Sequence, residues 1–132
     1  MKIKIIILLI LAFSTSCKKD HSNIDHDLVG KWTWESSVGG FSGSTYTPES
    51  TGESKTISFT SSGEMKIFLN DTLYSEEIIK TDYQIIDNSN IKYHILLIND
   101  LVFQIYSFPK TDSLILTDIM SDGYDHHYKR IE

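Results

Sequence analysis

The sequence predicts an all-β fold, an eight-stranded antiparallel up-and-down barrel that is closed or nearly closed. From Val29 onward, β-branched and aromatic residues alternate with polar residues, and Gly, Asn, Asp and Ser interrupt them at short intervals. No segment shows a helical period with end caps, so the sheet must bury its own face. Successive short hairpins favour closure, because a closed barrel leaves no exposed edge strand.

Eight strands are expected, separated by short turns. In the first strand, Trp32 and Trp34 fall on one face and the intervening polar residues on the other. Asn70 and Asp71 suit a tight turn, because both tolerate left-handed backbone angles. A charged residue interrupts the apolar positions of 72–87, which we interpret as one long strand with a bulge. The expected strands span 31–37, 56–60, 65–69, 72–87, 91–98, 101–108, 113–119 and 124–131.

The strands 91–98 and 101–108 are apolar on both faces, which predicts the best-buried hairpin of the domain. Because both faces are apolar, the sequence pattern does not show which face of each strand points into the barrel. We place Tyr93 toward the interior, and Leu96 and Ile98 on the opposite face.

The segment 38–54 contains five Gly or Pro residues and many Ser and Thr residues, which predicts an irregular loop over the open end of the barrel. Long connections in compact domains are often binding loops. The candidate ligand-lining residues are Trp34, Phe41, Tyr46, Phe59 and Tyr93. The alternative is that these aromatic side chains fill the interior and leave no cavity.

Several short motifs, in order along the chain, resemble the short bacterial lipocalin-like domains. The match spans about 28–131. Its pieces are Leu28-Val29-Gly30-Lys31-Trp32, Gly39-Gly40, Thr47-Pro48-Glu49, Phe59-x-x-x-Gly63, Asp82-Tyr83-x-Ile85, Asp112-Ser113-Leu114-x-Leu116 and Tyr128-Lys129-Arg130. The resemblance implies a barrel that takes a small ligand. It also implies a structural plug at one end, made by Gly30, Trp32 and Arg130, and an arginine stacks well on an indole ring.

The N-terminal residues resemble a bacterial lipoprotein signal peptide. A basic start precedes the apolar run 5–13, which is followed by the small residues 14–16 and by Cys17, the single cysteine of the chain. The run is shorter than the roughly 20 residues of a membrane-spanning helix. Such families usually have an aliphatic residue where this chain has Ser14. The resemblance implies cleavage before Cys17 and its acylation, and the alternative is an ordinary secretory leader with a leftover thiol.

The expected organisation is a signal peptide over 1–16, a flexible polar tether over 17–27 and one barrel domain over 28–132. Loss of Lys2 and Lys4 with the leader changes the net charge from −6 to −8, which argues against nucleic acid as a partner. With Cys17 acylated, the domain has no cysteine left for a disulfide.

Two groups of residues have metal-ligand chemistry. His21 and His26 lie in the tether, where a solvated spacer is the simpler interpretation. His126 and His127 follow two aspartates, but adjacent strand residues point to opposite faces, so at most one can join a common site. We expect no metal, no cofactor and no catalytic set, and therefore no enzyme.

Two functions remain open. The first is a lipid-anchored module that binds a small hydrophobic or amphipathic ligand in the barrel. The second is a filled barrel that acts through its outer face as a structural or protein-interaction module; Phe68, Leu96 and Ile98 are its expected outer residues. Either would be attached to a membrane through acyl chains, such as palmitate, on Cys17. The expected location is the bacterial cell envelope, at the outer membrane, with the face of that membrane left open.

Overall fold

Nine strands follow one another along residues 23–86, 88 and 90–132, which are the residues that this computed structural model describes. The expected leader, Cys17 and residues 18–22 of the expected tether lie outside them. The elements are η1 (His26–Leu28), β1 (Gly30–Gly39), β2 (Ser44–Tyr46), α1 (Pro48–Thr51), β3 (Lys55–Phe59), β4 (Glu64–Leu69), β5 (Thr72–Ile85), β6 (Lys92–Ile98), β7 (Leu101–Lys110), β8 (Ser113–Asp118) and β9 (Tyr124–Arg130).

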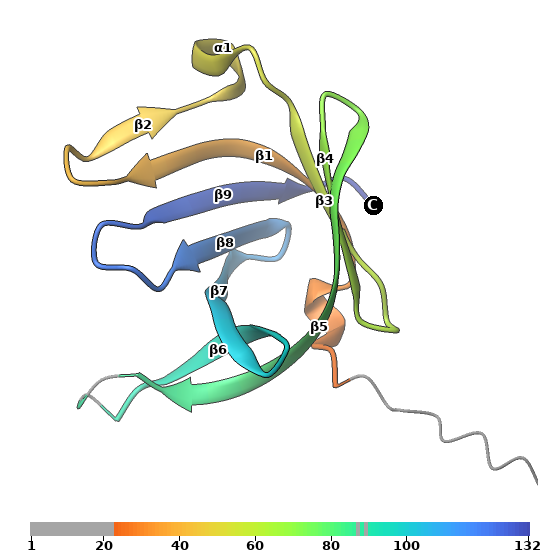
Figure 1. The fold of residues 1–132 in the computed structure, drawn as a ribbon, viewed down its shortest axis with the longest axis vertical. Coiled ribbons are helices and arrows are strands. Elements are labelled where there is room, and N and C mark those ends of the chain that lie inside the picture. The colour runs from red at the N-terminus through yellow and green to blue at the C-terminus, as the bar shows by residue number, and fades with distance from the viewer. Residues whose placement is uncertain (1–22, 87, 89) are drawn as a thin grey trace, which may run out of the picture.

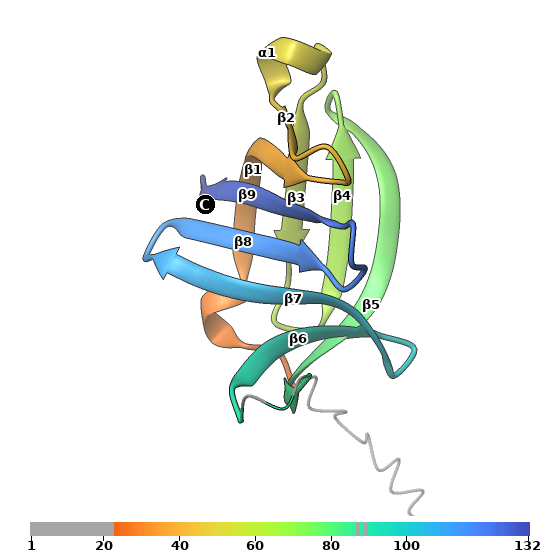
Figure 2. The ribbon, with the colours of Figure 1, turned by 90° about the vertical axis from the view of Figure 1, so that its left-hand side faces the viewer.

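Strand β1 closes the barrel, because it pairs with β3 on one side and with the last strand, β9, on the other. Trp32 lies opposite both Ile57 and Arg130 in these two ladders. All neighbouring strands are antiparallel, so the predicted eight-stranded up-and-down barrel is confirmed, with β2 as one additional strand. In Figure 1, β1, β9 and β8 run side by side, and Figure 2 shows them crossing in front of β3 and β4.

The turns form where the sequence predicts them. Asn70 and Asp71 have φ angles of 48° and 63°, and Asn99 and Asp100 repeat this left-handed pair between β6 and β7. The predicted long strand is β5, and Tyr74 is its bulge, because Ile67 lies opposite Ser75 while the next residue lies opposite Leu73.

Strand β5 changes its partners along its length. Residues 72–78 pair with β4, and residues 79–85 pair with β6. Within the described residues, 72–78 therefore have one paired neighbour strand only. Figure 1 shows β5 curving from the β4 side of the barrel down to the β6 hairpin.

The interior is filled by one cluster of buried side chains. A register shift between Trp34 and Ser36 on β1 turns Ser37 inward after the two tryptophans. The buried hydrophobic members are Leu28, Trp32, Trp34, Ile57, Phe59, Met65, Ile79, Leu96, Tyr106, Leu114, Leu116 and Tyr128. These residues lie mainly toward the end where β1 begins.

The inside and outside of β6 are reversed relative to our expectation. Leu96 is fully buried in the core, and Ile98 packs against it. Tyr93 therefore lies on the outer face of the strand, since it is three positions before Leu96 and successive strand residues point to opposite faces. Among the three residues expected outside, only Phe68 faces away from the interior. It lies opposite Thr56, whose neighbours on β3, Lys55 and Ile57, point inward.

The segment 38–54 is more regular than predicted. Its first residues continue β1, residues 44–46 form β2, and Pro48–Thr51 form the single turn α1. Thr47 and Ser50 make a reciprocal capping box, with proline at the first turn and Gly52 in a left-handed conformation after the last. A four-residue helix is too short to display a hydrophobic period, and it buries no side chain.

One end of the barrel is closed by an arginine stacked on a tryptophan. Trp32 is fully buried and donates from Nε1 to the Leu28 carbonyl at 3.0 Å. The Arg130 Cζ lies 4.1 Å from the centroid of its ring, and Arg130 Nη1 donates to the Val29 carbonyl at 2.8 Å. Gly30 has a φ of 141°, and a Cβ there would lie 2.5 Å from Arg130 Nη1. Only glycine fits beneath this arginine.

Residues 23–27, the last part of the expected tether, contact the barrel at this same end. The Thr81 backbone N–H donates to the Asn23 carbonyl at 2.9 Å, and the Asp25 N–H donates to Thr81 Oγ1 at 2.8 Å. Tyr106 Oη donates to Asp25 Oδ2 at 2.9 Å. These hydrogen bonds join residues 23–27 to β5 and β7.

Replacing Arg130 with alanine removes both the ring contact and the hydrogen bonds to the carbonyls before β1. We expect Arg130→Ala to lower the free energy of unfolding by about 2 kcal/mol, measured by urea denaturation. Lys129→Ala is the matched control, because Lys129 is an exposed neighbour on the same strand. Equal losses in the two variants would contradict the structural role of Arg130.

Candidate functional site

A cavity of about 250 Å³ lies inside the barrel at the end opposite the Trp32 and Arg130 stack. Its position follows from β3, which begins at the cavity with Lys55 and ends at Phe59, opposite Gly30 of the closed end. Six strands and the residues before β3 supply its walls. The lining residues are Glu53, Lys55, Ile57, Ile67, Leu69, Tyr74, Phe103, Gln104, Leu116, His126 and Tyr128.

The cavity wall has an apolar and a polar part. Ile57 of β3, Ile67 and Leu69 of β4, and Leu116 of β8 give aliphatic surface, and Phe103 adds an aromatic ring. The polar residues come mostly from β7, β9 and the start of β3. Such a mixture, mainly apolar with a few polar groups, is typical of small-molecule sites.

A chain of hydrogen bonds lies behind the polar part of the cavity. Trp34 Nε1 donates to Ser37 Oγ at 2.9 Å, and Ser37 Oγ lies 2.6 Å from His126 Nδ1. His126 Nε2 lies 3.4 Å from Asp118 Oδ2, whose other oxygen accepts from Gln104 Nε2 at 2.9 Å. Four strands thus contribute to one network, and its register depends on the bulge in β1.

One protonation state satisfies this network. With its proton on Nε2, neutral His126 donates a hydrogen bond to Asp118. Its Nδ1 accepts a hydrogen bond from the Ser37 hydroxyl, whose oxygen accepts one from Trp34. The residue types match those of a hydrolytic triad. However, Ser37 is 6% exposed and is not among the residues that line the cavity. The network therefore positions His126 at the cavity wall and Trp34 behind it.

The network shifts the pKa values of its two titratable groups. Burial lowers the pKa of His126, although the Asp118 carboxylate acts in the opposite direction. Burial acts to raise the pKa of Asp118, but the hydrogen bonds from Gln104 and from the Tyr124 backbone N–H, together with His126, lower it below its usual value. Near neutral pH, the site therefore holds a neutral imidazole beside an ionised carboxylate.

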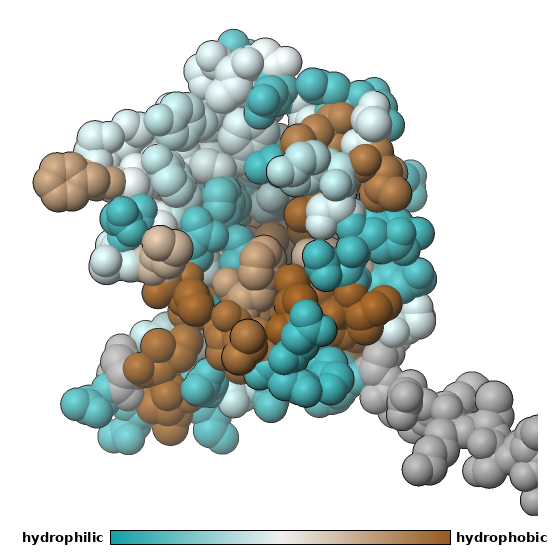
Figure 3. Space-filling model, in the orientation of Figure 1, coloured by the Kyte–Doolittle hydropathy of each residue, from teal (hydrophilic) through white to brown (hydrophobic). Residues whose placement is uncertain are grey.

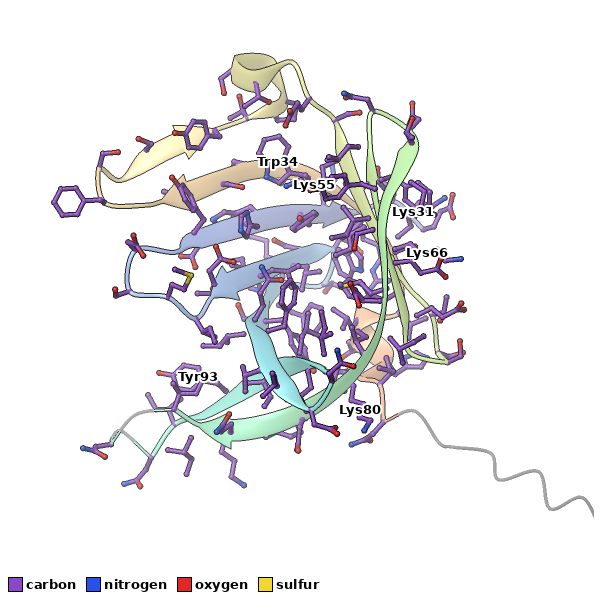
Figure 4. All side chains as sticks on the ribbon, viewed as in Figure 1. Lys31, Trp34, Lys55, Lys66, Lys80 and Tyr93 are labelled. Carbon is purple, nitrogen blue, oxygen red and sulfur yellow. The ribbon has the colours of Figure 1, made fainter. Side chains whose placement is uncertain are left out.

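Lys55 brings a positive charge to the cavity. Its Nζ lies 5.3 Å from the centroid of the Trp34 ring. Among the described residues, no carboxylate lies within ion-pair distance of this ammonium group. Figure 4 shows Lys55 beside Trp34 on the inner side of β3, whereas Lys66 lies on the outer side of β4, where it pairs with Glu76 at 3.4 Å.

Tyr128 brings a phenolic hydroxyl to the same cavity. The residue is 4% exposed, and burial raises its pKa, so the hydroxyl keeps its proton. Within the part of the chain that the structure describes, its Oη has no hydrogen-bond partner. The hydroxyl oxygen is not itself fully buried, and it is available to a molecule in the cavity.

The residues predicted to line the ligand site have different fates. Trp34 lies just behind the cavity, beneath Lys55, whereas Phe59 is buried in the core at the closed end. Phe41 is fully exposed in the turn between β1 and β2. Tyr46 on β2 is 44% exposed and contacts the ring of Tyr124. None of these four lines the cavity, and Tyr93 lies on the outer face of β6.

Sequence reasoning missed the polar half of the site. Lys55 and Tyr128 both alternate in phase with core residues, Ile57 and Arg130 respectively, and this phase was the available signal. For His126, the rule that only one of two adjacent histidines joins a site holds, since its partners are Ser37 and Asp118. Asp118 lies within the expected strand 113–119, and nothing in the local sequence pattern distinguishes it as a site residue.

A second, larger depression of about 590 Å³ lies on the outside of the closed end. It is formed by η1, the turn between β7 and β8, and Arg130. His26 and Asp27 on its wall are almost fully exposed, and Arg130 is already engaged with the carbonyls before β1. The interior cavity is therefore the better candidate site.

Two negative findings concern the described residues only. Within 23–86, 88 and 90–132, no three His, Cys, Asp or Glu side chains are grouped so that they could hold a metal ion. The same residues contain no helix with the length and apolar character needed to cross a membrane.

No family model, curated protein or solved structure matches this chain. The geometry of the cavity is therefore the main basis for an argument about function.

The lowered pKa of His126 predicts how stability depends on pH. Between the folded pKa and about 6.5, the unfolded chain binds more protons than the folded protein, so stability falls as the pH falls through this range. We expect His126→Gln to be less stable at pH 7.5, by about 1–3 kcal/mol, because Ser37 loses a partner. The same variant should lose less further stability between pH 7.5 and 5.5 than the wild type.

The measurement is urea denaturation at several pH values. His127→Gln is the matched control, because this histidine points away from Ser37 and Asp118 on the same strand. A wild-type pH dependence that survives in His126→Gln would show that another group causes it. Below pH 4, protonation of Asp118 should destabilise the wild type further, since its folded pKa is also lowered.

Proposed function

We propose that this protein is a lipid-anchored lipoprotein of the lipocalin-like type whose barrel binds a small hydrophobic or amphipathic ligand. The observation that carries the proposal is the cavity of about 250 Å³ at the open end of the closed barrel. Barrels of eight strands either fill with side chains or hold one small ligand. Here one end is filled by the core cluster and the other end has free space.

The size and lining of the cavity support a small ligand. Sites for drug-sized molecules measure about 300–1,000 Å³, so this cavity suits a molecule somewhat smaller than those. Aliphatic side chains of β3, β4 and β8 would contact its apolar part. The polar groups of Lys55 and Tyr128 would contact the remainder.

The anchor rests on the resemblance of residues 1–17 to lipoprotein signals. Asn23, which is bonded to β5, is the sixth residue after Cys17. An extended chain of that length spans at most about 20 Å, so acylation would hold the barrel close to a membrane. The bacterial cell envelope, at the outer membrane, is the location that fits such an anchor.

Native mass spectrometry of the protein isolated from its own membrane tests the ligand. We expect a co-purifying small molecule of constant mass. Leu69→Trp should abolish or strongly reduce it, because the larger ring would occupy the cavity that Leu69 lines.

Phe68→Trp is the control for this experiment, since Phe68 is the adjacent residue on the opposite face of β4. It should retain the bound molecule. A small molecule that remains equally in both variants would be bound elsewhere, and its absence from the wild type would argue against a ligand-binding barrel.

The anchor has a test of its own. Cys17→Ala should prevent acylation, and the protein should move from the membrane fraction to the soluble fraction of the cell. Mass spectrometry of the wild-type N-terminus should find Cys17 as the first residue, carrying acyl chains. A Cys17→Ala variant that stays with the membrane would contradict the proposed anchor.

A second candidate function is an interaction module that acts through its surface. Figure 3 shows apolar residues gathered over β5, β6 and β7 in the lower half of this face, while the half with β2 and α1 is mostly polar. Ile78 and Leu101 on these strands are 65% and 73% exposed. Such surface is typical of contact sites. A retained protein partner without any small molecule, in the same mass spectra, would favour this function.

A further inference from the structure

Two hydrogen-bond donors without protein acceptors face the same cavity. The Lys55 ammonium has no ion-pair partner among the described residues and lies over the Trp34 ring. The Tyr128 hydroxyl, on a residue that is 4% exposed, likewise has no partner there. Both donors meet the open space of the cavity, where a molecule can accept hydrogen bonds from them.

Two other polar side chains of the cavity are already engaged. His126 is held by Ser37 and Asp118, and the Gln104 amide donates to Asp118. The carboxylate of Asp118 also accepts from the Tyr124 backbone N–H at 3.1 Å. Glu53 and Tyr74 also line the cavity, but Glu53 is a carboxylate and Tyr74 is 71% exposed. Lys55 and Tyr128 are therefore the inner donors that can recognise a polar atom of a ligand.

The charge of the neighbourhood limits which anion fits. A cation and a neutral donor suit an acceptor with one negative charge. Asp118 is ionised and lies close enough to act on Tyr128, and Glu53 stands at the edge of the cavity. Both carboxylates would repel a group with two negative charges, such as a phosphate monoester.

The remaining wall is apolar. Ile67 and Leu69 of β4, with Phe103 of β7, line the cavity beside the two donors. A molecule whose charged end meets Lys55 can place a short hydrocarbon part against these side chains, which gains the free energy of burial.

We propose that the ligand of this cavity is a small amphipathic carboxylate, with its carboxylate group bound by Lys55 and Tyr128 and its hydrocarbon part bound by the aliphatic wall. This assignment rests on the proposed ligand-binding function and adds the chemical class of the ligand. Because burial raises the pKa of Tyr128, the hydroxyl stays a donor across the physiological range. The Trp34 ring beneath Lys55 helps to fix the ammonium group in place.

The test uses the full chain in lipid nanodiscs and octanoate labelled with carbon-13 at its carboxyl carbon. Empty nanodiscs give the signal of octanoate in lipid. The protein should add a separate carboxylate resonance, from which a dissociation constant is obtained by titration. Labelled 1-octanol, which has a similar hydrocarbon part and no charge, should bind at least about tenfold more weakly, a difference of about 1.4 kcal/mol.

Lys55→Met should weaken octanoate binding about tenfold or more and leave 1-octanol binding nearly unchanged. Tyr128→Phe should weaken octanoate binding about threefold or more. Lys66→Met is the matched control, because Lys66 lies on the outer side of β4, paired with Glu76; it should bind octanoate like the wild type. Lys55→Gln and a urea unfolding curve for each variant separate lost binding from lost folding.

Two outcomes would overturn the assignment, and they differ in what else they affect. If octanoate and 1-octanol bind equally and Lys55→Met changes neither, the carboxylate assignment is wrong while a ligand-binding barrel stands. If neither probe binds, and the isolated protein carries no small molecule, the assignment and the proposed function both fall.

Discussion

The contact between Arg130 and Trp32 closes one end of the barrel, so that free space inside it lies at the opposite end. The guanidinium covers the indole at 4.1 Å and donates to the carbonyl before β1, so the first and last strands and the segment leading into the barrel meet at one point. Trp32 in turn bonds to Leu28 of η1. Aromatic and aliphatic core residues fill the space beneath, and the cavity remains only at the far end of β3 and β4.

The opposite end is organised by polar groups. Hydrogen bonds that link Trp34, Ser37, His126, Asp118 and Gln104 join β1, β9, β8 and β7. In an interior of low dielectric constant, such a network stabilises a structure only when its members are satisfied. These groups satisfy one another, whereas the donors of Lys55 and Tyr128 stay open to the cavity. The same hydrogen bonds thus hold β1, β7, β8 and β9 together at this end and shape the polar side of the cavity.

Much of the fold could be predicted from local patterns. Alternation located eight strands, the Asn-Asp pairs located two turns, and a charge-interrupted apolar run located the bulged β5. The contact between Trp32 and Arg130 could be expected from the resemblance to lipocalin-like domains, together with the tendency of arginine to stack on an indole ring. The phase of β6 could not, since Tyr93, Ile95 and Leu97 are as apolar as the residues that alternate with them. The cavity also could not, because its polar residues come from strands distant in sequence, and a one-residue bulge in β1 decides that Ser37 points inward.

The change of partners in β5 has a mechanical consequence. Residues 72–78 are joined to β4 alone, and the pairing with β6 starts at Ile79. Tyr74 on this half and Phe103 on β7 both border the cavity. The wall between them is thus a seam without ladder bonds among the described residues. A ligand of the kind proposed above would therefore enter from the side, between β5 and β7, and not past the end that Trp32 and Arg130 close.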